Sequence, residues 1–424
     1  MLTILIMYLI IEAAEQFLAI MNLKHLARHG AEVPPGFEKH VDSSTLKRIR
    51  DYTVEHGRLA RISAFVSMVV TILFLFGGLL NWLNSFIVEQ GWTAVVSGCI
   101  FFLALIYGET LITIPISLYK TFSIEKRYGF TTQTLALWGK DLLKSLILNT
   151  LLVGFLVYVL LWIIQTLPEI WWLAGWLFLL CFSVFVLYIS PYVIEPLFNK
   201  FKPMEDSSLE GRIKGTMTRA GLKINRVFSM DASKRSSHSN AYFTGIGHVK
   251  RIVLFDTLLA NHEDNEIIAI LAHEAGHWKK KHVLKMLVFS QIIGLIGFYL
   301  AHKLTAGDVL ADIFMLDNST MYAKLLLVVF IGTLALFPLK PLMAYISRRH
   351  ELEADNFALQ LTGTPGPMAD ALIKLGKDNL ANLHPHPLYA SVYYSHPPLA
   401  QRVKRILSET ANCGEKKMEN TNLA

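Results

Sequence analysis

The chain has 424 residues, of which 53% are hydrophobic and only 17% are charged, and its mean hydropathy is +0.41. These values lie outside the range of ordinary soluble domains and indicate several membrane spans. The net charge of +7 comes without a basic-aromatic patch or a nucleic-acid-binding motif, so we expect no nucleic-acid partner. The three cysteines have no CxxC spacing, which argues against a disulfide framework.

Seven apolar runs approach the length that crosses about 30 Å of hydrocarbon. They lie at 2–21, 64–86, 97–119, 145–165, 171–191, 284–302 and 322–345. The first run contains Glu12 and Glu15, and it has neither a basic start nor a clear small-residue cleavage site. We interpret it as a retained span rather than a signal peptide that is removed.

Basic residues alternate between the loops that join these runs. The loops after the first and third runs are rich in Lys and Arg, whereas 87–96 and 166–170 contain neither and 304–320 carries only aspartates as charges. The positive-inside rule then places the amino terminus outside or in a lumen and the carboxyl terminus in the cytoplasm. The membrane would be the inner membrane of a bacterium or the endoplasmic reticulum of a eukaryote.

Two long polar stretches, 192–283 and 346–424, fall on the cytoplasmic side and show patterns of folded structure. Residues 207–222 and 264–281 have helical patterns, and 251–259 begins as a short strand of β-branched and aromatic residues. The last residues, 413–424, form a polar tail that we expect to be disordered.

The segment LAHEAGHWKKKH carries the strongest chemical signal. On a helix, His273 and His277 are four residues apart, so they project from one face and can share one Zn²⁺. Glu274 lies beside them, placed to take a proton from water at the metal. A solvated helix with two histidines on a polar face is the structural alternative, which the otherwise apolar helix disfavours. We interpret His282, in the basic run that follows, as a solvated residue at the membrane edge.

Two histidines and a water leave a tetrahedral zinc one protein ligand short. In RRHELEADNFAL, Glu351 and Asp355 are four residues apart and share a helical face, whereas Glu353 points elsewhere. This arrangement suits Glu351 as the third ligand and Asp355 as the carboxylate that orients a ligand histidine. The charged first turn of an ordinary helix would explain the same residues equally well, and His350 is a lower-ranked alternative ligand.

Further motifs extend over most of the chain after residue 120. In chain order they are IEKRYGF (124–130), SPYVIEPLFNKFKP (190–203), SHSNAYFTGIG (237–247), KRIVLFDTLL (250–259), HEAGH (273–277), ELEAD (351–355) and YYSHPPLAQR (393–402). With these motifs the chain resembles the type I CAAX prenyl endopeptidases, which are integral-membrane zinc peptidases of the gluzincin kind.

The resemblance implies roles that spacing alone does not give. Glu351 would be the third zinc ligand, and Asn240 and Ala241 would lie on an edge strand that pairs with the substrate backbone. His396 would help to stabilise the tetrahedral oxyanion, and Arg402 would bind substrate or brace the site. The spans would enclose a large water-filled chamber, capped on the cytoplasmic side by the zinc domain.

We therefore predict a predominantly α polytopic membrane protein with about seven transmembrane helices and a small α+β zinc-peptidase domain. The predicted division is spans one to five in 1–191, the zinc-peptidase domain in 192–283, spans six and seven in 284–345, the remainder of that domain in 346–412, and the tail in 413–424.

The leading functional hypothesis is a zinc metalloendopeptidase that removes the last three residues from prenylated CAAX proteins or peptides. The substrate lipid would stay in the membrane or in the chamber, so membrane lipid is a second expected partner. Two alternatives stay open: a quality-control metallopeptidase for membrane proteins that needs no prenyl group, and a non-catalytic membrane binding or transport protein. The sequence indicates no particular oligomeric state.

Overall fold

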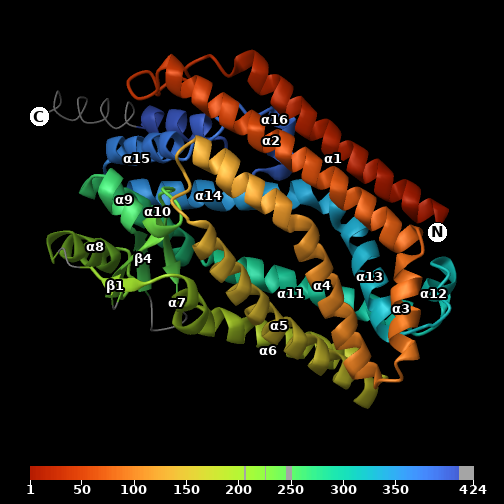
Figure 1. Cartoon of the computed structure of the whole chain (residues 1–424). Coiled ribbons are helices and arrows are strands. Elements are labelled where there is room, and N and C mark those ends of the chain that lie inside the picture. The colour runs from red at the N-terminus through yellow and green to blue at the C-terminus, as the bar shows by residue number, and fades with distance from the viewer. Residues whose placement is uncertain (205–206, 225, 245–250, 410–424) are drawn as a thin grey trace, which may run out of the picture.

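The computed structural model describes residues 1–204, 207–224, 226–244 and 251–409 and is mainly helical (Figure 1). Among these residues, seven helices are long and apolar enough to cross a membrane, and they follow the order of the seven predicted spans. The prediction of a predominantly helical membrane protein is confirmed. The predicted tail, 413–424, lies outside the described residues.

Long helices form the first half of the chain and flank a small sheet in the second half. The helices before the sheet are α1 (Leu2–His29), α2 (Ser43–Thr71), α3 (Leu79–Glu89), α4 (Ala94–Tyr119), α5 (Leu135–Thr166), α6 (Trp171–Ile189) and α7 (Glu195–Phe198). Those within and after the sheet region are α8 (Ser207–Arg219), α9 (Asp256–Asn261), α10 (Asp264–Lys279), α11 (His282–Thr305), α12 (Val309–Ile313), α13 (Met321–Leu336), α14 (Lys340–Thr362), α15 (Pro365–Asp378) and α16 (Pro387–Tyr393).

Two predicted spans differ from the helices that form. The sequence predicts a second span at 64–86, but the long helix ends at Phe76, and Gly78 at φ +88° turns the chain before α3. That left-handed conformation is easy only for glycine. The predicted seventh span, 322–345, is interrupted by a 3-10 segment that contains Pro338, so α14 starts afresh at Lys340. α14 then continues across the domain boundary predicted after residue 345.

The first span and the start of α14 are joined by an ion pair. A carboxylate oxygen of Glu15 on α1 lies 2.5 Å from Nζ of Lys340. Charged side chains inside apolar segments are stable mainly when they are paired. The partner on α14 therefore accounts for one of the two glutamates that interrupt the first apolar run.

A four-stranded sheet lies at one end of the helical bundle (Figure 1). Its strands are β1 (Phe201–Pro203), β2 (Arg226–Met230), β3 (Ala241–Thr244) and β4 (Arg251–Phe255), in the spatial order β1-β2-β4-β3. β2 and β4 are parallel, and the other two pairs are antiparallel. β3 is therefore an edge strand. The apolar run 251–259 begins with the strand β4, as its pattern predicts, and continues into the helix α9.

The sheet packs against the helix that carries HEAGH. Ile252 and Leu254 of β4 belong to one buried cluster with Ile267 and Leu271 of α10 and with Ile213 of α8. Alternate residues of a strand point to the same face, and the apolar positions of α10 recur at helical spacing. This core fixes α10 against the sheet and brings the β3 edge beside HEAGH.

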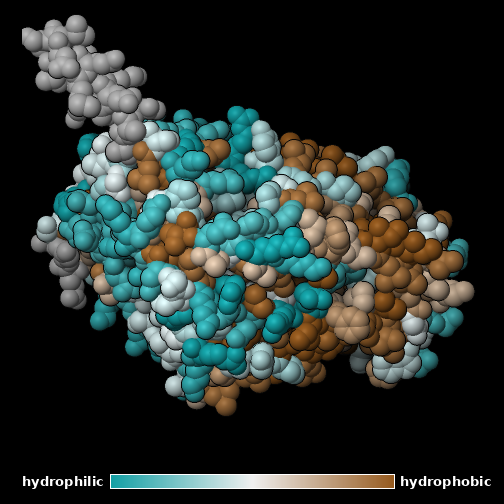
Figure 2. All heavy atoms as spheres, turned by 90° about the horizontal axis from the view of Figure 1, so that it is seen from above, coloured by the Kyte–Doolittle hydropathy of each residue, from teal (hydrophilic) through white to brown (hydrophobic). Residues whose placement is uncertain are grey.

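The basic loops lie at the same end of the molecule as the sheet. Phe37 and Val41, which follow α1, share a buried cluster with Phe130, which follows α4, and with Val403. Figure 2 shows hydrophilic side chains gathered over one end of the molecule and hydrophobic ones over the other. The loops that the positive-inside rule assigns to one side of the membrane thus share one side of the fold.

Candidate metal centre

The HEAGH helix, α10, is bounded by local signals at both ends. Its first turn carries a capping box, in which the side chain of Glu263 accepts from the backbone N–H of Glu266 and the reverse bond is 3.0 Å long. After α10 ends at Lys279, Lys281 adopts φ 57° and redirects the chain into α11. HEAGH therefore lies just outside the sixth apolar span.

Two imidazoles and one carboxylate meet between α10 and α14. The Nε2 atoms of His273 and His277 are 3.2 Å apart, and oxygens of Glu351 lie 3.3 Å and 3.2 Å from them. Ligands about 2.0–2.1 Å from a tetrahedral zinc are themselves about 3.3–3.4 Å apart. The three donors therefore fit one small tetrahedral ion. One oxygen of Glu351 is buried without a hydrogen-bond partner among the described residues, as expected for a metal ligand.

Glu351 reaches this position because α14 passes very close to α10. A Cβ atom added to Gly276 would lie 2.9 Å from Cα of Ala354 and 3.0 Å from its carbonyl oxygen. Only a residue without a side chain allows so close an approach of two backbones. The glycine inside HEAGH therefore sets the distance between the two helices that carry the donors.

Asp355 and Arg402 form a buried ion pair that contacts Nδ1 of His273, the ring nitrogen that faces away from the other donors. One oxygen of Asp355, which is 1% exposed, lies 2.8 Å from Nδ1 of His273. Arg402 donates to both oxygens of Asp355, at 2.6 Å and 3.0 Å. A proton on Nδ1 leaves the lone pair of Nε2 directed at the metal position. The orienting role of Asp355, and the role of Arg402 in binding substrate or bracing the site, stay predictions, and Arg402 contacts Asp355.

His277 has a second partner, which the sequence interpretation misses. His282, interpreted as solvated, is 3% exposed, and its Nδ1 lies 3.0 Å from Nδ1 of His277. Its Nε2 lies 3.1 Å from Glu353, so Glu353 does point away from the metal position. The solvated interpretation is wrong because the turn at Lys281 brings the start of α11 back against α10. His350, the alternative ligand, stacks on His282 and does not belong to the group of three donors.

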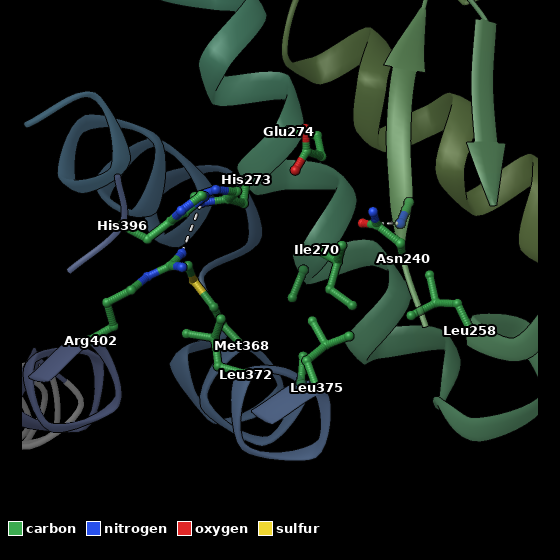
Figure 3. Close-up of a pocket in the computed structure, with 13 residues that line it drawn as sticks. Asn240, Leu258, Ile270, His273, Glu274, Met368, Leu372, Leu375, His396 and Arg402 are labelled. Atoms are coloured by element: carbon green, nitrogen blue, oxygen red, sulfur yellow. Dashed lines mark hydrogen bonds between the residues drawn. The ribbon is translucent and has the colours of Figure 1, made fainter. Parts of the chain in front are cut away.

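A cavity of about 140 Å³ opens beside the donors. Figure 3 shows His273, His396 and Arg402 together on one side, Asn240 on the other, and Glu274 above the space between them. Much of the rest of the wall is apolar and comes from α9, α10 and α15: Leu258, Ile270, Met368, Leu372 and Leu375.

His396 approaches the donors from the loop after α16. Its Nε2 lies 3.3 Å from Glu351, and its Nδ1 lies 2.9 Å from the hydroxyl of Ser395. Its side chain is 60% exposed, so it is accessible from the cavity. The structure thus brings His396 to the same place as HEAGH, as the resemblance implies.

The edge strand β3 begins at the same cavity. Asn240 and Ala241 both line it, on the side opposite His396 (Figure 3). The side chain of Asn240 accepts from the N–H of Ala241 at 2.8 Å, and its carbonyl accepts from the N–H of Phe255 on β4 at 3.1 Å. These bonds fix the start of the edge strand beside the donors. The part of these residues in substrate binding stays a prediction.

Burial and neighbouring charges shift the proton affinities of the site. Burial raises the pKa of Glu274 above its usual 4.5, although His273 and His277 oppose the change. Burial by itself lowers the pKa of His273, but the adjacent carboxylates of Asp355 and Glu351 outweigh it and raise the pKa to about 9. In the metal-free protein the raised pKa favours a protonated imidazole, and a metal ion that binds His273 must displace the proton on Nε2.

Comparison with known proteins gives the family. Residues 22–200 match the family model described as CAAX prenyl protease N-terminal, five membrane helices, and residues 203–410 match the model of peptidase family M48. CAAX prenyl protease 1 of Saccharomyces cerevisiae is 33% identical over 417 residues, which cover 92% of this chain and 91% of the relative. The chain belongs to peptidase family M48. This M48 peptidase is also 31% identical to a CAAX prenyl protease 1 homolog of Homo sapiens, over 92% of each chain.

The fold of this M48 peptidase matches a solved structure over nearly its whole length. The crystal structure of S. mikatae Ste24p superposes with a TM-score of 0.89 at 31% sequence identity and covers 96% of this chain and 98% of that chain. The predicted resemblance is confirmed, and the chain is a membrane metallopeptidase. A metal ion is therefore implied, and the three donors between α10 and α14 fit it.

Proposed function

We propose that this M48 peptidase binds one Zn²⁺ through His273, His277 and Glu351 and removes the last three residues from prenylated CAAX proteins. The observation that carries the proposal is the 3.2–3.3 Å spacing of these donors beside a cavity, in a chain whose relatives are CAAX prenyl proteases. When bound, zinc acts as a Lewis acid toward the scissile carbonyl and lowers the pKa of water.

Glu274 is the general base and acid of the proposed reaction. It takes a proton from the attacking water and then delivers it to the amine that leaves. Because burial raises the pKa of this carboxyl group, its proton affinity is closer to that required near neutral pH. A fully exposed glutamate, with its lower pKa, would be a weaker base toward the attacking water.

The histidine and arginine after α16 support the reaction in different ways. His396 donates a hydrogen bond from Nε2 to the oxyanion that develops on the scissile carbonyl. Partial desolvation lowers the pKa of His396, although Glu351 opposes the change, and this favours the neutral imidazole. Arg402 neutralises Asp355, and that carboxylate in turn holds the ring of His273.

The cavity and the edge strand suit an extended aliphatic peptide end. A substrate that pairs with β3 at Asn240 and Ala241 is held by main-chain hydrogen bonds, which tolerate different side chains. The apolar wall formed by Leu258, Met368 and Leu375 suits the two aliphatic residues of a CAAX sequence. A cavity of about 140 Å³ leaves little additional room.

We also propose that the metal site faces the cytoplasm. The loops rich in Lys and Arg lie at the same end of the fold as the metal site, and such loops are typically cytoplasmic. Residues 192–283 and 346–412 would then form one peptidase domain on that side, with α14 passing from the membrane into it. Reporter enzymes fused to the two termini test this topology, and a carboxyl-terminal reporter active only outside the cytoplasm contradicts it.

The function is tested with purified protein in phospholipid nanodiscs and a farnesylated CAAX peptide. We expect release of the last three residues by the wild type, loss on chelation, recovery with Zn²⁺, and a loss of about 10²–10⁴-fold in Glu274→Gln. Equal turnover by Glu274→Gln and the wild type contradicts the mechanism. An enzyme that ignores the prenyl peptide but cuts unfolded membrane proteins contradicts the proposed substrate and favours a quality-control peptidase.

A further inference from the structure

A second, larger cavity lies between α11 and α14. It has a volume of about 550 Å³, within the range of ligand pockets, and its wall is mainly apolar. We call it the α11/α14 groove. Its wall includes Met286, Phe289 and Ile293 of α11, Leu339 of the 3-10 segment, and Met343 and Ala344 of α14. Lys340 is the one charged residue among its described lining residues, and it pairs with Glu15.

The groove begins one helical turn from the donor Glu351 on α14 and one turn from His282, which contacts the donor His277, on α11. Ser347, which lines it, is four residues before Glu351 on α14, so the two share a face about 5–6 Å apart. Met286 is four residues after His282 on α11, and His282 contacts His277. From Met286 to Ile293 the groove extends for about 10 Å at 1.5 Å per residue.

The groove also adjoins the space around His396. Ser395 lines the groove, and the neighbouring His396 lines the catalytic cavity. A further cavity of about 520 Å³ is lined by Tyr393, Ser395, His396 and Arg402, and thus borders both. The catalytic cavity is bounded by α10 before the donors, whereas the groove is bounded by α11 after them. The donor His273 thus lines the catalytic cavity, and the groove starts about one helical turn from Glu351.

The prenyl chain of a CAAX substrate is attached close to the carbonyl group that reacts. If the proposed function holds, the hydrolysed carbonyl belongs to the prenylated cysteine, whose sulfur is three covalent bonds from the carbonyl carbon. The lipid must therefore start within a few ångströms of the metal, on the side away from the three residues that leave. The adjoining α11/α14 groove is mainly apolar and has about four times the volume of the catalytic cavity, so it offers more room for the lipid.

We propose that the α11/α14 groove binds the prenyl chain of the substrate, from its cysteine end near Ser395 toward Leu339. This inference rests on the proposed function and adds the position of the lipid. Each methylene group buried there stabilises the complex by an amount similar to its transfer from water into a membrane. The groove thus makes binding depend on the length of the prenyl chain.

The experiment fills the groove and compares two substrates that differ only in the lipid. Ser290 on α11 lines the groove and is exposed, so Ser290→Trp inserts bulk without overpacking a core. Val288→Trp, at an exposed position of the same helix outside the groove, is the matched control. The measured quantity is kcat/KM for the farnesyl peptide divided by kcat/KM for the S-methyl peptide. We expect Ser290→Trp to lower this ratio on the order of tenfold, because the tryptophan displaces about two methylene groups of the lipid from the groove. Val288→Trp leaves the ratio unchanged.

A binding measurement locates the lipid directly. A farnesyl peptide with a photoreactive group at the end of the lipid is bound to the Glu274→Gln variant in nanodiscs and irradiated, and the labelled segments are identified by mass spectrometry. Label in 286–293 and 336–347 is the expected result, and it should decrease in Ser290→Trp.

The outcomes separate the groove from the proposed function. Two results would overturn the proposal that the groove binds the prenyl chain and leave the proposed peptidase function intact. One is cleavage of the farnesyl peptide with label outside both segments. The other is an equal ratio of kcat/KM for the two peptides in Ser290→Trp and the wild type. Labelling of the groove by a photoreactive phospholipid that farnesyl peptide does not displace also overturns it. A wild type that cuts the S-methyl peptide but not the farnesyl peptide overturns the proposed function itself.

Discussion

Replacement of Gly276 by alanine should separate the two helices that carry the metal donors. The added Cβ would lie 2.9 Å from Cα of Ala354, whereas non-bonded carbon atoms prefer about 3.5–4.0 Å. α10 and α14 must therefore move apart by about 0.6–1 Å, because the opposing atoms are backbone and cannot rotate away. Metal–ligand distances tolerate changes of about 0.2 Å. Overpacking of this kind typically costs about 1–3 kcal/mol of folding free energy.

The expected result for Gly276→Ala is a folded protein with weakened metal binding and little turnover. Zinc content after dialysis against a weak chelator, the thermal unfolding midpoint and peptide cleavage measure the three quantities separately. Gly215→Ala on α8 is the matched control, because an added Cβ meets nothing within 4 Å there and alanine favours a helix by about 0.5–1 kcal/mol. Wild-type zinc content and turnover in Gly276→Ala would refute the reasoning.

Three further results follow from the groups around the donors. Asp355→Asn should weaken zinc binding by about 10–100-fold, measured by competition with a fluorescent chelator, and an unchanged affinity contradicts the orienting role. His282→Phe should produce a similar loss by removing the partner of His277, whereas wild-type affinity would make His282 a packing residue only. In metal-free protein the pKa of His273 is about 9, above the 6.5 of an unfolded chain, so its stabilising contribution is complete below about pH 6.5 and is lost as pH rises through 9. The unfolding midpoint of chelated protein should fall across that window, and a midpoint independent of pH there contradicts the assignment.

The two histidine donors could be predicted because they lie on a single helix, where four-residue spacing fixes a common face. For Glu351 and Asp355 the same spacing leaves an ordinary charged helical turn equally possible, so only the resemblance singles out Glu351 as the third donor. The same spacing predicts that Glu353 points away from the metal position, and its carboxylate contacts His282. The seven spans were equally accessible, because hydropathy over about twenty residues is a local property.

The parts that sequence reasoning misses depend on how separate segments meet. His282 belongs to another helix than His277, and only the turn at Lys281 brings the two rings together. His396 and Asn240 come from an irregular loop and the start of an edge strand, where no periodicity marks a functional residue, so only the resemblance pointed to them. The ends of the second and seventh spans depend on backbone breaks that average hydropathy does not detect.

α14 behaves as a lever with its fulcrum at the 3-10 segment before Lys340. Glu351 is eleven residues beyond that point, about 17 Å along the axis, so a tilt of about 2° displaces it by about 0.6 Å. Productive catalytic geometry tolerates a displacement of only about 0.5 Å. The close contact at Gly276 opposes this rotation, so the carboxylate stays in place only while the two helices stay in register. The position of Glu351 among the donors is therefore set at two points along one helix, by the 3-10 segment where α14 starts and by the contact with Gly276.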